Sequence, residues 1–112
     1  MKKVLVLGGS GFVGRHLCEA LNRRGIQVTV PTRRLPARSV QRLPFVTVVR
    51  ANVHDADSLR QLIAGHDAVV NLVAVLHGDE ARFEQLHVTL PTTVAQACLA
   101  AGVRRLVHVS AL

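Results

Sequence analysis

Residues 3–14 read KVLVLGGSGFVG, an apolar run followed directly by a cluster of glycines. The run Val4–Leu7 does not alternate with polar residues, which is typical of a strand buried on both faces. The glycines fit the spacing GxGxxG through Gly9, Gly11 and Gly14, and the spacing GxxGxxG when Gly8 replaces Gly9. A strand, a glycine loop and the start of a helix near the N-terminus form the context that this motif requires.

This glycine loop is suited to holding phosphate groups. Its early glycines allow a tight turn and let the backbone approach a pyrophosphate, and its last glycine lets the helix and strand pack closely. The helix that follows presents unpaired N–H groups and a partial positive charge to an anion. A structural turn without a ligand is the alternative, but the strand before the loop and the helix after it favour dinucleotide binding.

The rest of the chain alternates between strand and helix patterns. Further strands are expected at 26–30, ended by Pro31, and at 45–49, 68–75 and 106–109. Helices are expected from Val13 to about Arg24, around Leu59–Ile63, and from Asp79 to Ala101 with an apolar stripe at Leu86, Leu90, Val94, Ala97 and Ala101. The helix ends are marked by Gly25, Gly65 and Gly102, and either Asp55 or Asp57 can cap the second helix. Such alternation implies right-handed βαβ units and a parallel sheet covered on both faces.

The predicted fold class is therefore α/β, a Rossmann-type doubly wound parallel sheet of five strands. A length of 112 residues allows one domain. Such a sheet usually has more strands, and a crossover helix is expected after the last one. We expect residues 1–112 to be the N-terminal portion of a larger NAD(P)-binding Rossmann domain. The open edge of the fifth strand predicts self-association of this chain.

The positive charge of the chain is concentrated in one segment. Lys and Arg number 14 against 7 Asp and Glu, but no carboxylate occurs from Ala20 to His54. That segment contains seven arginines, namely Arg23, Arg24, Arg33, Arg34, Arg38, Arg42 and Arg50. A single basic segment favours the binding of one anionic ligand or one contact surface, whereas basic residues spread over the surface would favour nonspecific polyanion binding. Aromatic residues make up 3% with no Trp or Tyr, so a nucleic-acid module that stacks bases is not expected.

The sequence does not indicate a disulfide, a metal site, a signal peptide or a membrane span. Cys18 and Cys98 lie far apart without a CxxC pair, which predicts two buried, reduced thiols rather than a disulfide or a zinc site. The six histidines show no HExxH pattern, so no metal site is expected. The apolar run after Lys2 and Lys3 is too short for a signal peptide, and no segment is long enough to span a bilayer. We expect a cytoplasmic protein.

Four segments resemble the short-chain dehydrogenase/reductase superfamily, in its extended or atypical, epimerase/dehydratase-like branch: GGSGFVG at 8–14, NLVA at 71–74, VAQAC at 94–98 and VRRLVHVS at 103–110. The resemblance covers the whole chain and implies the strand order 3-2-1-4-5. It also implies that Asn52 and Val53 hold the adenine, where the family often has Asp, and that the backbone at 72–74 passes the nicotinamide ribose. More narrowly, HVSAL and the arginine-rich turn resemble proteins similar to the NADP(H)-binding accessory subunit of respiratory complex I.

Arg33 and Arg34, at the end of the second predicted strand, favour NADP(H) over NAD(H). NAD sites place a carboxylate there for the ribose 2′-hydroxyl, whereas a guanidinium can hold a 2′-phosphate. The alternative is that these arginines only solubilise a loop, and NAD(H) is the alternative cofactor. The expected cofactor-binding residues are Gly8, Ser10, Gly11, Phe12, Val13, Gly14, Arg33, Arg34, Asn52, Val53, Leu72, Val73, Ala74 and His87.

Two further positions each allow two interpretations. Arg15 follows the last glycine and either faces the phosphate or points to solvent. Pro91 lies four residues after His87, the position that corresponds to an Asn of the family. It predicts either a kink that opens the carbonyl of His87 toward the cofactor or a break between two helices.

Catalytic residues are not assigned in this chain. Reductases of the superfamily use a Ser, a Tyr and a Lys, whereas this sequence has no Tyr, its lysines are Lys2 and Lys3, and Leu112 stands where the Ser typically falls. We expect the NAD(P)-binding domain of an oxidoreductase-like protein, not catalytic by itself. The alternative is a non-catalytic accessory or redox-sensing protein that holds NADP(H) structurally. That role implies a respiratory-complex partner and a location at the inner face of the membrane.

Overall fold

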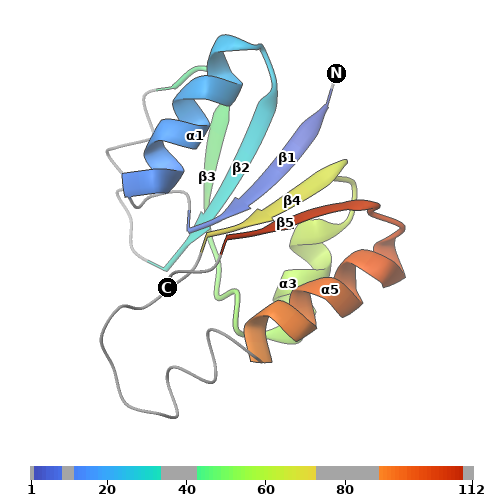
Figure 1. Cartoon of the computed structure of the whole chain (residues 1–112). Helices are drawn as coiled ribbons and strands as arrows, with labels where there is room; N and C mark the ends of the chain where they lie inside the picture. Colours follow the sequence, from blue (N-terminus) through green and yellow to red (C-terminus); the bar gives the residue numbers. More distant parts are fainter. Residues whose placement is uncertain (1, 9–11, 34–42, 73–88, 110–112) are drawn as a thin grey trace.

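Five strands of the described residues form a parallel sheet in the order β3-β2-β1-β4-β5, which confirms the predicted Rossmann-type order. Figure 1 shows the sheet in a computed structural model of the chain, which describes residues 2–8, 12–33, 43–72 and 89–109. The elements in chain order are β1 (Lys3–Leu7), α1 (Phe12–Arg23), β2 (Gln27–Thr32), β3 (Val46–Arg50), α3 (Ala56–Ile63), β4 (Ala68–Asn71), α5 (Leu90–Ala101) and β5 (Arg105–His108).

Strand β1 lies at the centre of the sheet and is paired on both sides. Lys3 pairs with Gln27 of β2, and Val4 pairs with Ala68 of β4. All four residues of Val4–Leu7 are buried. The unbroken apolar run at the start of the sequence is therefore explained by burial on both faces of the sheet.

Helices cover both faces of the sheet. Figure 1 shows α1 on one face and α3 and α5 together on the other. The α1 face contains a buried cluster of Val4, Val6, Cys18, Val28, Val30 and Val46. The opposite face contains a second cluster of Leu5, Leu7, Leu59, Ile63, Val69, Leu90, Val94, Ala97, Cys98 and Val103. Both cysteines are buried and free, as predicted.

Strand β2 does not stop at Pro31, contrary to the prediction. It continues to Thr32, and Pro31 pairs with Val49 of β3. The N–H of Val28 donates to the carbonyl of Phe45, the residue before β3. The N–H groups of Val30 and Thr32 therefore face β3, and the nitrogen of Pro31 faces β1. Pairing between β1 and β2 ends at Thr29, as expected when the next β2 residue that faces β1 is a proline and has no N–H to donate.

Strand β4 ends at Asn71, before the predicted end at Val75. Its partner β1 ends at Leu7, and Gly8 then turns the chain with a φ of 81°, which only glycine adopts readily. Leu72 continues the pairing with one hydrogen bond, from its N–H to the carbonyl of Leu7 at 2.8 Å. Residues 73–75 lie outside the described residues.

Helix α5 begins at Leu90, and Pro91 lies in its first turn, where proline is well tolerated. Residues 79–88 of the predicted helix, with Leu86 and His87, lie outside the described residues. Leu90, Val94, Ala97 and Cys98 are buried, but Ala101 is exposed, contrary to the predicted stripe. Val103, which follows the left-handed turn at Gly102, fills that end of the core instead.

The remaining helix ends agree with the sequence. Asp55 caps α3, with its side chain accepting from the N–H of Asp57, and Gly25 has the left-handed backbone expected after α1. Within the described ranges, no helix combines the length and apolar character needed to cross a membrane.

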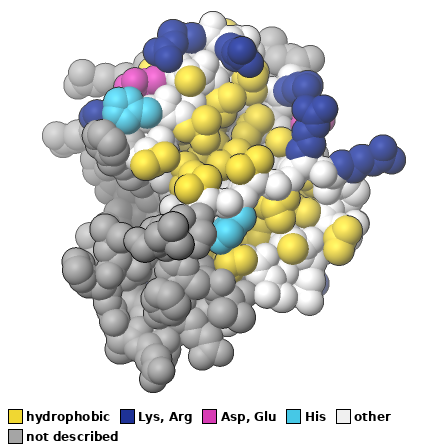
Figure 2. Space-filling view, in the orientation of Figure 1, with side chains coloured by type: hydrophobic (Ala, Val, Ile, Leu, Met, Phe, Trp, Pro, Cys, Tyr) yellow, Lys and Arg dark blue, Asp and Glu magenta, His cyan; other side chains and the backbone are white. Residues whose placement is uncertain are grey.

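Figure 2 shows apolar side chains across the middle of the face seen in Figure 1, with basic side chains above them and to their right. The edge strand β5 contributes the exposed apolar residues Leu106 and Val107, and Val109, which follows it directly, is also exposed. This edge has no neighbouring strand among the described residues.

Candidate functional site

The carboxyl ends of the strands bring most of the described candidate residues to one edge of the sheet. Gly8 follows β1 directly, and its φ of 81° turns the chain toward α1. Phe12 is the first residue of α1, and Gly14 is buried in the first turn. The burial of Gly14 agrees with the close packing of helix and strand that the last glycine of the motif allows.

The first turn of α1 is suited to an anion. It contains no acidic residue, and Val13 is exposed. The Nε atom of Arg15 is buried and has no hydrogen-bond partner among the described residues. A buried guanidinium nitrogen without an acceptor is unfavourable, and the positive charge of Arg15 would attract an anion at the N-terminus of α1.

Arg33 and Asn52, two residues predicted independently, lie in contact. The Nη2 atom of Arg33 donates to Oδ1 of Asn52 at 2.9 Å. The parallel register explains this contact, because Thr32 pairs with Arg50 and the N–H of Ala51 donates to the carbonyl of Thr32 at 3.0 Å. The residues that follow β2 and β3 therefore lie side by side, which the sequence reasoning did not identify.

The turn that begins at Asn52 fixes its side chain. Oδ1 of Asn52 also accepts from the N–H of His54 at 3.0 Å, and the carbonyl of Asn52 accepts from the N–H of Asp55 at 3.2 Å. This is the side-chain turn that Asn and Asp favour. Val53 is half-buried and packs against the core of the α3 and α5 face, so its side chain is used in packing.

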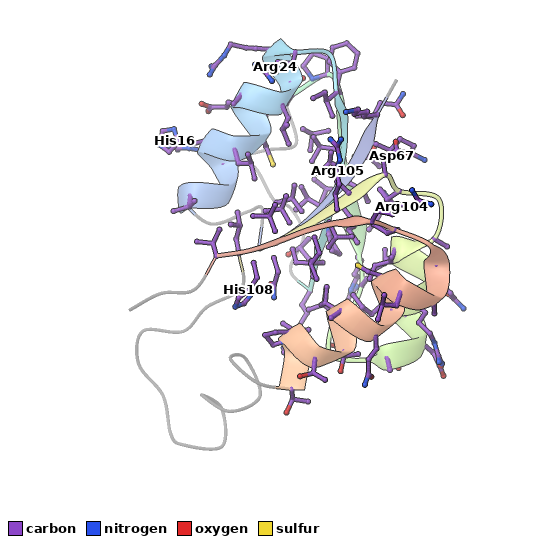
Figure 3. All side chains as sticks on the ribbon, turned by 45° about the vertical axis from the view of Figure 1, so that its right-hand side comes forward. His16, Arg24, Asp67, Arg104, Arg105 and His108 are labelled. Atoms are coloured by element: carbon purple, nitrogen blue, oxygen red, sulfur yellow. The ribbon has the colours of Figure 1, made fainter. Side chains whose placement is uncertain are left out.

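Asn71 is a buried polar residue at the same edge that the sequence reasoning did not single out. Its side chain is 1% exposed, and its Nδ2 atom lies 3.2 Å from Nδ1 of His108. Figure 3 shows His108 at the carboxyl end of β5, far from Arg105 at the other end. Leu72, the next residue, packs against the apolar cluster under α1. This contact gives the buried amide nitrogen a partner and joins the ends of β4 and β5.

Several predicted positions lie outside the described residues: Ser10, Gly11, Arg34, Val73, Ala74 and His87. Of Phe12, only the backbone position at the start of α1 is described. The described part of the candidate site therefore consists of Gly8, Val13, Gly14, Arg33, Asn52, Val53 and Leu72.

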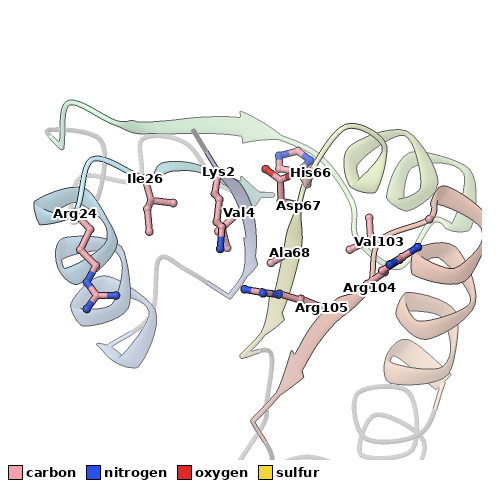
Figure 4. A pocket seen from close by; sticks show the side chains of 11 residues that line it. Lys2, Val4, Arg24, Ile26, His66, Asp67, Ala68, Val103, Arg104 and Arg105 are labelled. Carbon is pink, nitrogen blue, oxygen red and sulfur yellow. The ribbon is translucent and has the colours of Figure 1, made fainter.

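A cavity of about 580 Å³ lies at the opposite, amino edge of the sheet. Figure 4 shows Lys2, Arg24 and Arg105 around its apolar floor, which includes Val4 and Ala68. No glycine loop or helix N-terminus reaches this edge among its lining residues. It is therefore separate from the edge at which the dinucleotide motif lies.

The pKa values of Cys18, Cys98 and His66 differ from those of free side chains. Burial, with a contribution from Glu19, raises the pKa of Cys18 to about 11, and burial raises the pKa of Cys98. Both thiols are therefore protonated at neutral pH and are poor nucleophiles. Burial and the charge of Lys3 lower the pKa of His66, whose Nε2 lies 3.0 Å from Oγ1 of Thr29.

The sequence is similar to one protein family and to several curated proteins. The sequence model of the NAD dependent epimerase/dehydratase family matches residues 4–111. The mitochondrial NADH dehydrogenase (ubiquinone) 1 alpha subcomplex subunit 9 of Mus musculus is 35% identical over 115 residues, covering 96% of this chain and 30% of that protein. The 2-alkyl-3-oxoalkanoate reductase of Stenotrophomonas maltophilia is 35% identical over 111 residues, covering 96% of this chain and 33% of the reductase.

A solved structure is similar over the same region. It is a short-chain dehydrogenase/reductase superfamily protein from Agrobacterium tumefaciens with bound NAD, with a TM-score of 0.78 and 30% identity. The match covers 95% of this chain and 31% of that one. The chain thus spans about a third of the length of the curated relatives that it matches.

Proposed function

The chain belongs to the NAD dependent epimerase/dehydratase family, and from that premise we propose that it is a dinucleotide-binding domain that prefers NADP(H) to NAD(H). The observation that carries this proposal is the position of Arg33 at the end of β2, hydrogen-bonded to Asn52, in a segment without a carboxylate. A 2′-phosphate is attracted by a guanidinium and repelled by a carboxylate.

The other candidate residues have roles along the same dinucleotide. Gly8, Ser10, Gly11 and Gly14 would let the pyrophosphate approach the N-terminus of α1, where Phe12 and Val13 provide backbone N–H groups. Asn52 and Val53 would adjoin the adenosine, and Leu72, Val73, Ala74 and His87 the nicotinamide ribose. When bound, the nicotinamide would supply hydride transfer.

Competition binding tests this function on the chain itself. NADPH is bound first, and its displacement by equal amounts of NADP⁺ and NAD⁺ is followed by nicotinamide fluorescence. The proposal expects NADP⁺ to displace NADPH at lower concentration than NAD⁺ does. Equal displacement by the two would contradict the NADP preference, and no NADPH binding at all would contradict the function.

A second candidate function is a non-catalytic one, in which NADP(H) is held as a structural group of an accessory protein. Two residue identities favour it, because His87 and Leu112 stand where family enzymes typically carry Asn and Ser. Similarity to the mouse NADH dehydrogenase subunit supports the same role and a respiratory-complex partner. We further propose that residues 1–112 form the N-terminal portion of a larger domain, since the relatives are longer.

The two functions differ in a measurable way. A longer protein that contains this domain and a downstream Tyr-x-x-x-Lys sequence should oxidise NADPH with a carbonyl substrate. A protein without that sequence should retain NADP(H) through purification and show no turnover. Retention without turnover would support the accessory role, and turnover would exclude it.

A further inference from the structure

We propose that Asn52 determines cofactor specificity, because its neutral amide holds Arg33 in place without cancelling the charge that the 2′-phosphate of NADP(H) requires. This inference rests on the proposed function and deepens it. Asn52 acts through Arg33 as a positioning residue, beyond the adenine contact that the resemblance implies for this position.

A backbone hydrogen bond holds the acceptor oxygen of Asn52 in place independently of Arg33. The N–H of His54 donates to Oδ1 of Asn52 at 3.0 Å, and the same oxygen accepts from Nη2 of Arg33 at 2.9 Å. A carbonyl-type oxygen has two lone pairs, so one atom can accept both bonds. The turn at Asn52 therefore orients a guanidinium that is otherwise exposed and rich in rotamers.

The hydrogen bond to Asn52 orients the guanidinium of Arg33 without neutralising its charge. The two ion pairs found within the described ranges join Arg60 to Asp57 and His16 to Glu19, and neither involves Arg33. No carboxylate occurs between Ala20 and His54, and the carboxylate of Asp55 accepts from the N–H of Asp57 and the hydroxyl of Ser58 in the cap of α3. The guanidinium donates one N–H to Asn52 and retains others for a phosphate oxygen.

A carboxylate at position 52 would change the charge and keep the geometry. Asp has the shape of Asn, favours the same side-chain turn, and would accept from both His54 and Arg33. It would also form an ion pair with Arg33 and place a negative charge beside the incoming phosphate. Holding Arg33 with an amide therefore keeps its full charge for the 2′-phosphate, which an aspartate at position 52 would partly offset.

The substitution Asn52→Asp tests this inference in the full chain, with NADPH and NADH as the titrants. The expected loss is about tenfold in NADPH affinity at low ionic strength, with less than about a threefold change for NADH. The dependence of NADPH affinity on salt should also become shallower, because the net charge facing the phosphate falls. A merely structural role for Asn52 would weaken both dinucleotides equally.

Asn22→Asp is the matched control. Oδ1 of Asn22 accepts from the N–H of Phe45 at 3.0 Å, so this substitution also adds one charge to an amide that holds a backbone N–H. It lies before β2 and β3, at the opposite edge of the sheet from Asn52. We expect it to leave the ratio of NADPH to NADH affinity unchanged.

A double variant shows whether Asn52 acts through Arg33. In the Arg33→Ala background, Asn52→Asp should lower NADPH affinity by a smaller factor than in the unchanged chain. An equal factor in both backgrounds would overturn the inference, as would an unchanged preference for NADPH in Asn52→Asp. If the unchanged chain prefers NADPH, these outcomes leave the proposed function intact, whereas failure of that chain to bind either dinucleotide refutes both.

Discussion

The guanidinium of Arg33 donates to the side chain of Asn52 at 2.9 Å, across a separation of 19 positions in sequence. The contact joins the residues that follow two neighbouring parallel strands, β2 and β3. We propose that it places a positive charge beside the adenosine ribose of the dinucleotide. The cofactor preference proposed for this domain depends on this pair.

Arg33→Ala should reduce the affinity for NADPH by about tenfold to a hundredfold, because a charged hydrogen bond contributes about 1.5–3 kcal/mol. The affinity for NADH should change little, since NADH has no 2′-phosphate. Fluorescence titration of both dinucleotides measures the two effects. Arg33→Lys should keep part of the affinity, because it retains the charge without the planar fork. Equal losses for NADPH and NADH would show that Arg33 does not recognise the 2′-phosphate.

Gly8→Ala should destabilise the fold by about 1–2 kcal/mol, because a left-handed backbone is strained for any residue with a Cβ. Gly65→Ala is the matched control, since Gly65 has a similar φ of 83° and no atom within 4 Å of its would-be Cβ. Gly65 precedes β4 and so lies at the amino edge of the sheet, away from the candidate site. Both variants should lower the midpoint of urea unfolding. Only Gly8→Ala should also weaken NADPH binding in the folded protein, and equal binding in the two variants would argue against a phosphate loop at Gly8.

Asp55→Ala should cost about 1 kcal/mol of stability, because Asp55 caps α3 at the end of the turn that begins with Asn52. Its carboxylate accepts from the N–H of Asp57 at 3.3 Å and from the hydroxyl of Ser58 at 2.9 Å. Asp57→Ala removes the exposed pair with Arg60 and a carboxylate in the first turn of α3, and it should cost less than Asp55→Ala does. Urea unfolding curves compare the two variants, and similar losses would mean that Asp55 is not the main cap.

Stability should fall as the pH is lowered through the range of histidine titration. The pKa of His66 is lowered by burial and by Lys3, so the unfolded chain binds a proton more readily than the folded one. The contribution of the neutral His66 imidazole to the free energy of unfolding is fully present above its pKa in the unfolded chain, which is about 6.5. This contribution is lost as the pH falls toward the lower pKa that His66 has in the folded chain. Unfolding at pH 7.5 and pH 5.5 measures the slope. His66→Gln should make it shallower, and an identical slope would contradict this assignment.

The edge strand β5 should support self-association. Leu106, Val107 and Val109 are exposed there, and no strand of the described residues pairs with β5 on its outer side. An open edge of this kind invites pairing with another chain. Sedimentation at high concentration should show species larger than a monomer, and Val107→Lys should reduce them. A single sharp monomer at high concentration would refute this prediction.

The fold was predictable because its strongest signals are local. Val4–Leu7 followed by glycines indicates a buried strand and a turn, and the structure places that strand at the centre of the sheet. The end of β2 was not predictable from the sequence, because Pro31 ends the pairing with β1 at Thr29 while the pairing with β3 continues to Thr32. Ala101 was likewise assigned to the core by its spacing, whereas the turn at Gly102 brings Val103 there instead.

The candidate site was predictable in its residue types and only partly in its contacts. The charge pattern and strand order indicated Arg33, and the family resemblance indicated Asn52. Their hydrogen bond depends on the register of two strands distant in sequence, which no local pattern specifies. The buried pair Asn71 and His108 was missed for the same reason, since each is an ordinary strand residue until β4 and β5 are aligned.

Side-by-side titration of the unchanged chain with NADPH and NADH tests the central claim most directly. Both dinucleotides share the fluorescent nicotinamide and differ only in the 2′-phosphate, so the ratio of their dissociation constants isolates recognition of that group. The ratio should favour NADPH by about tenfold or more at low ionic strength and should shrink as salt is added. Equal affinities, or tighter binding of NADH, would contradict the claim.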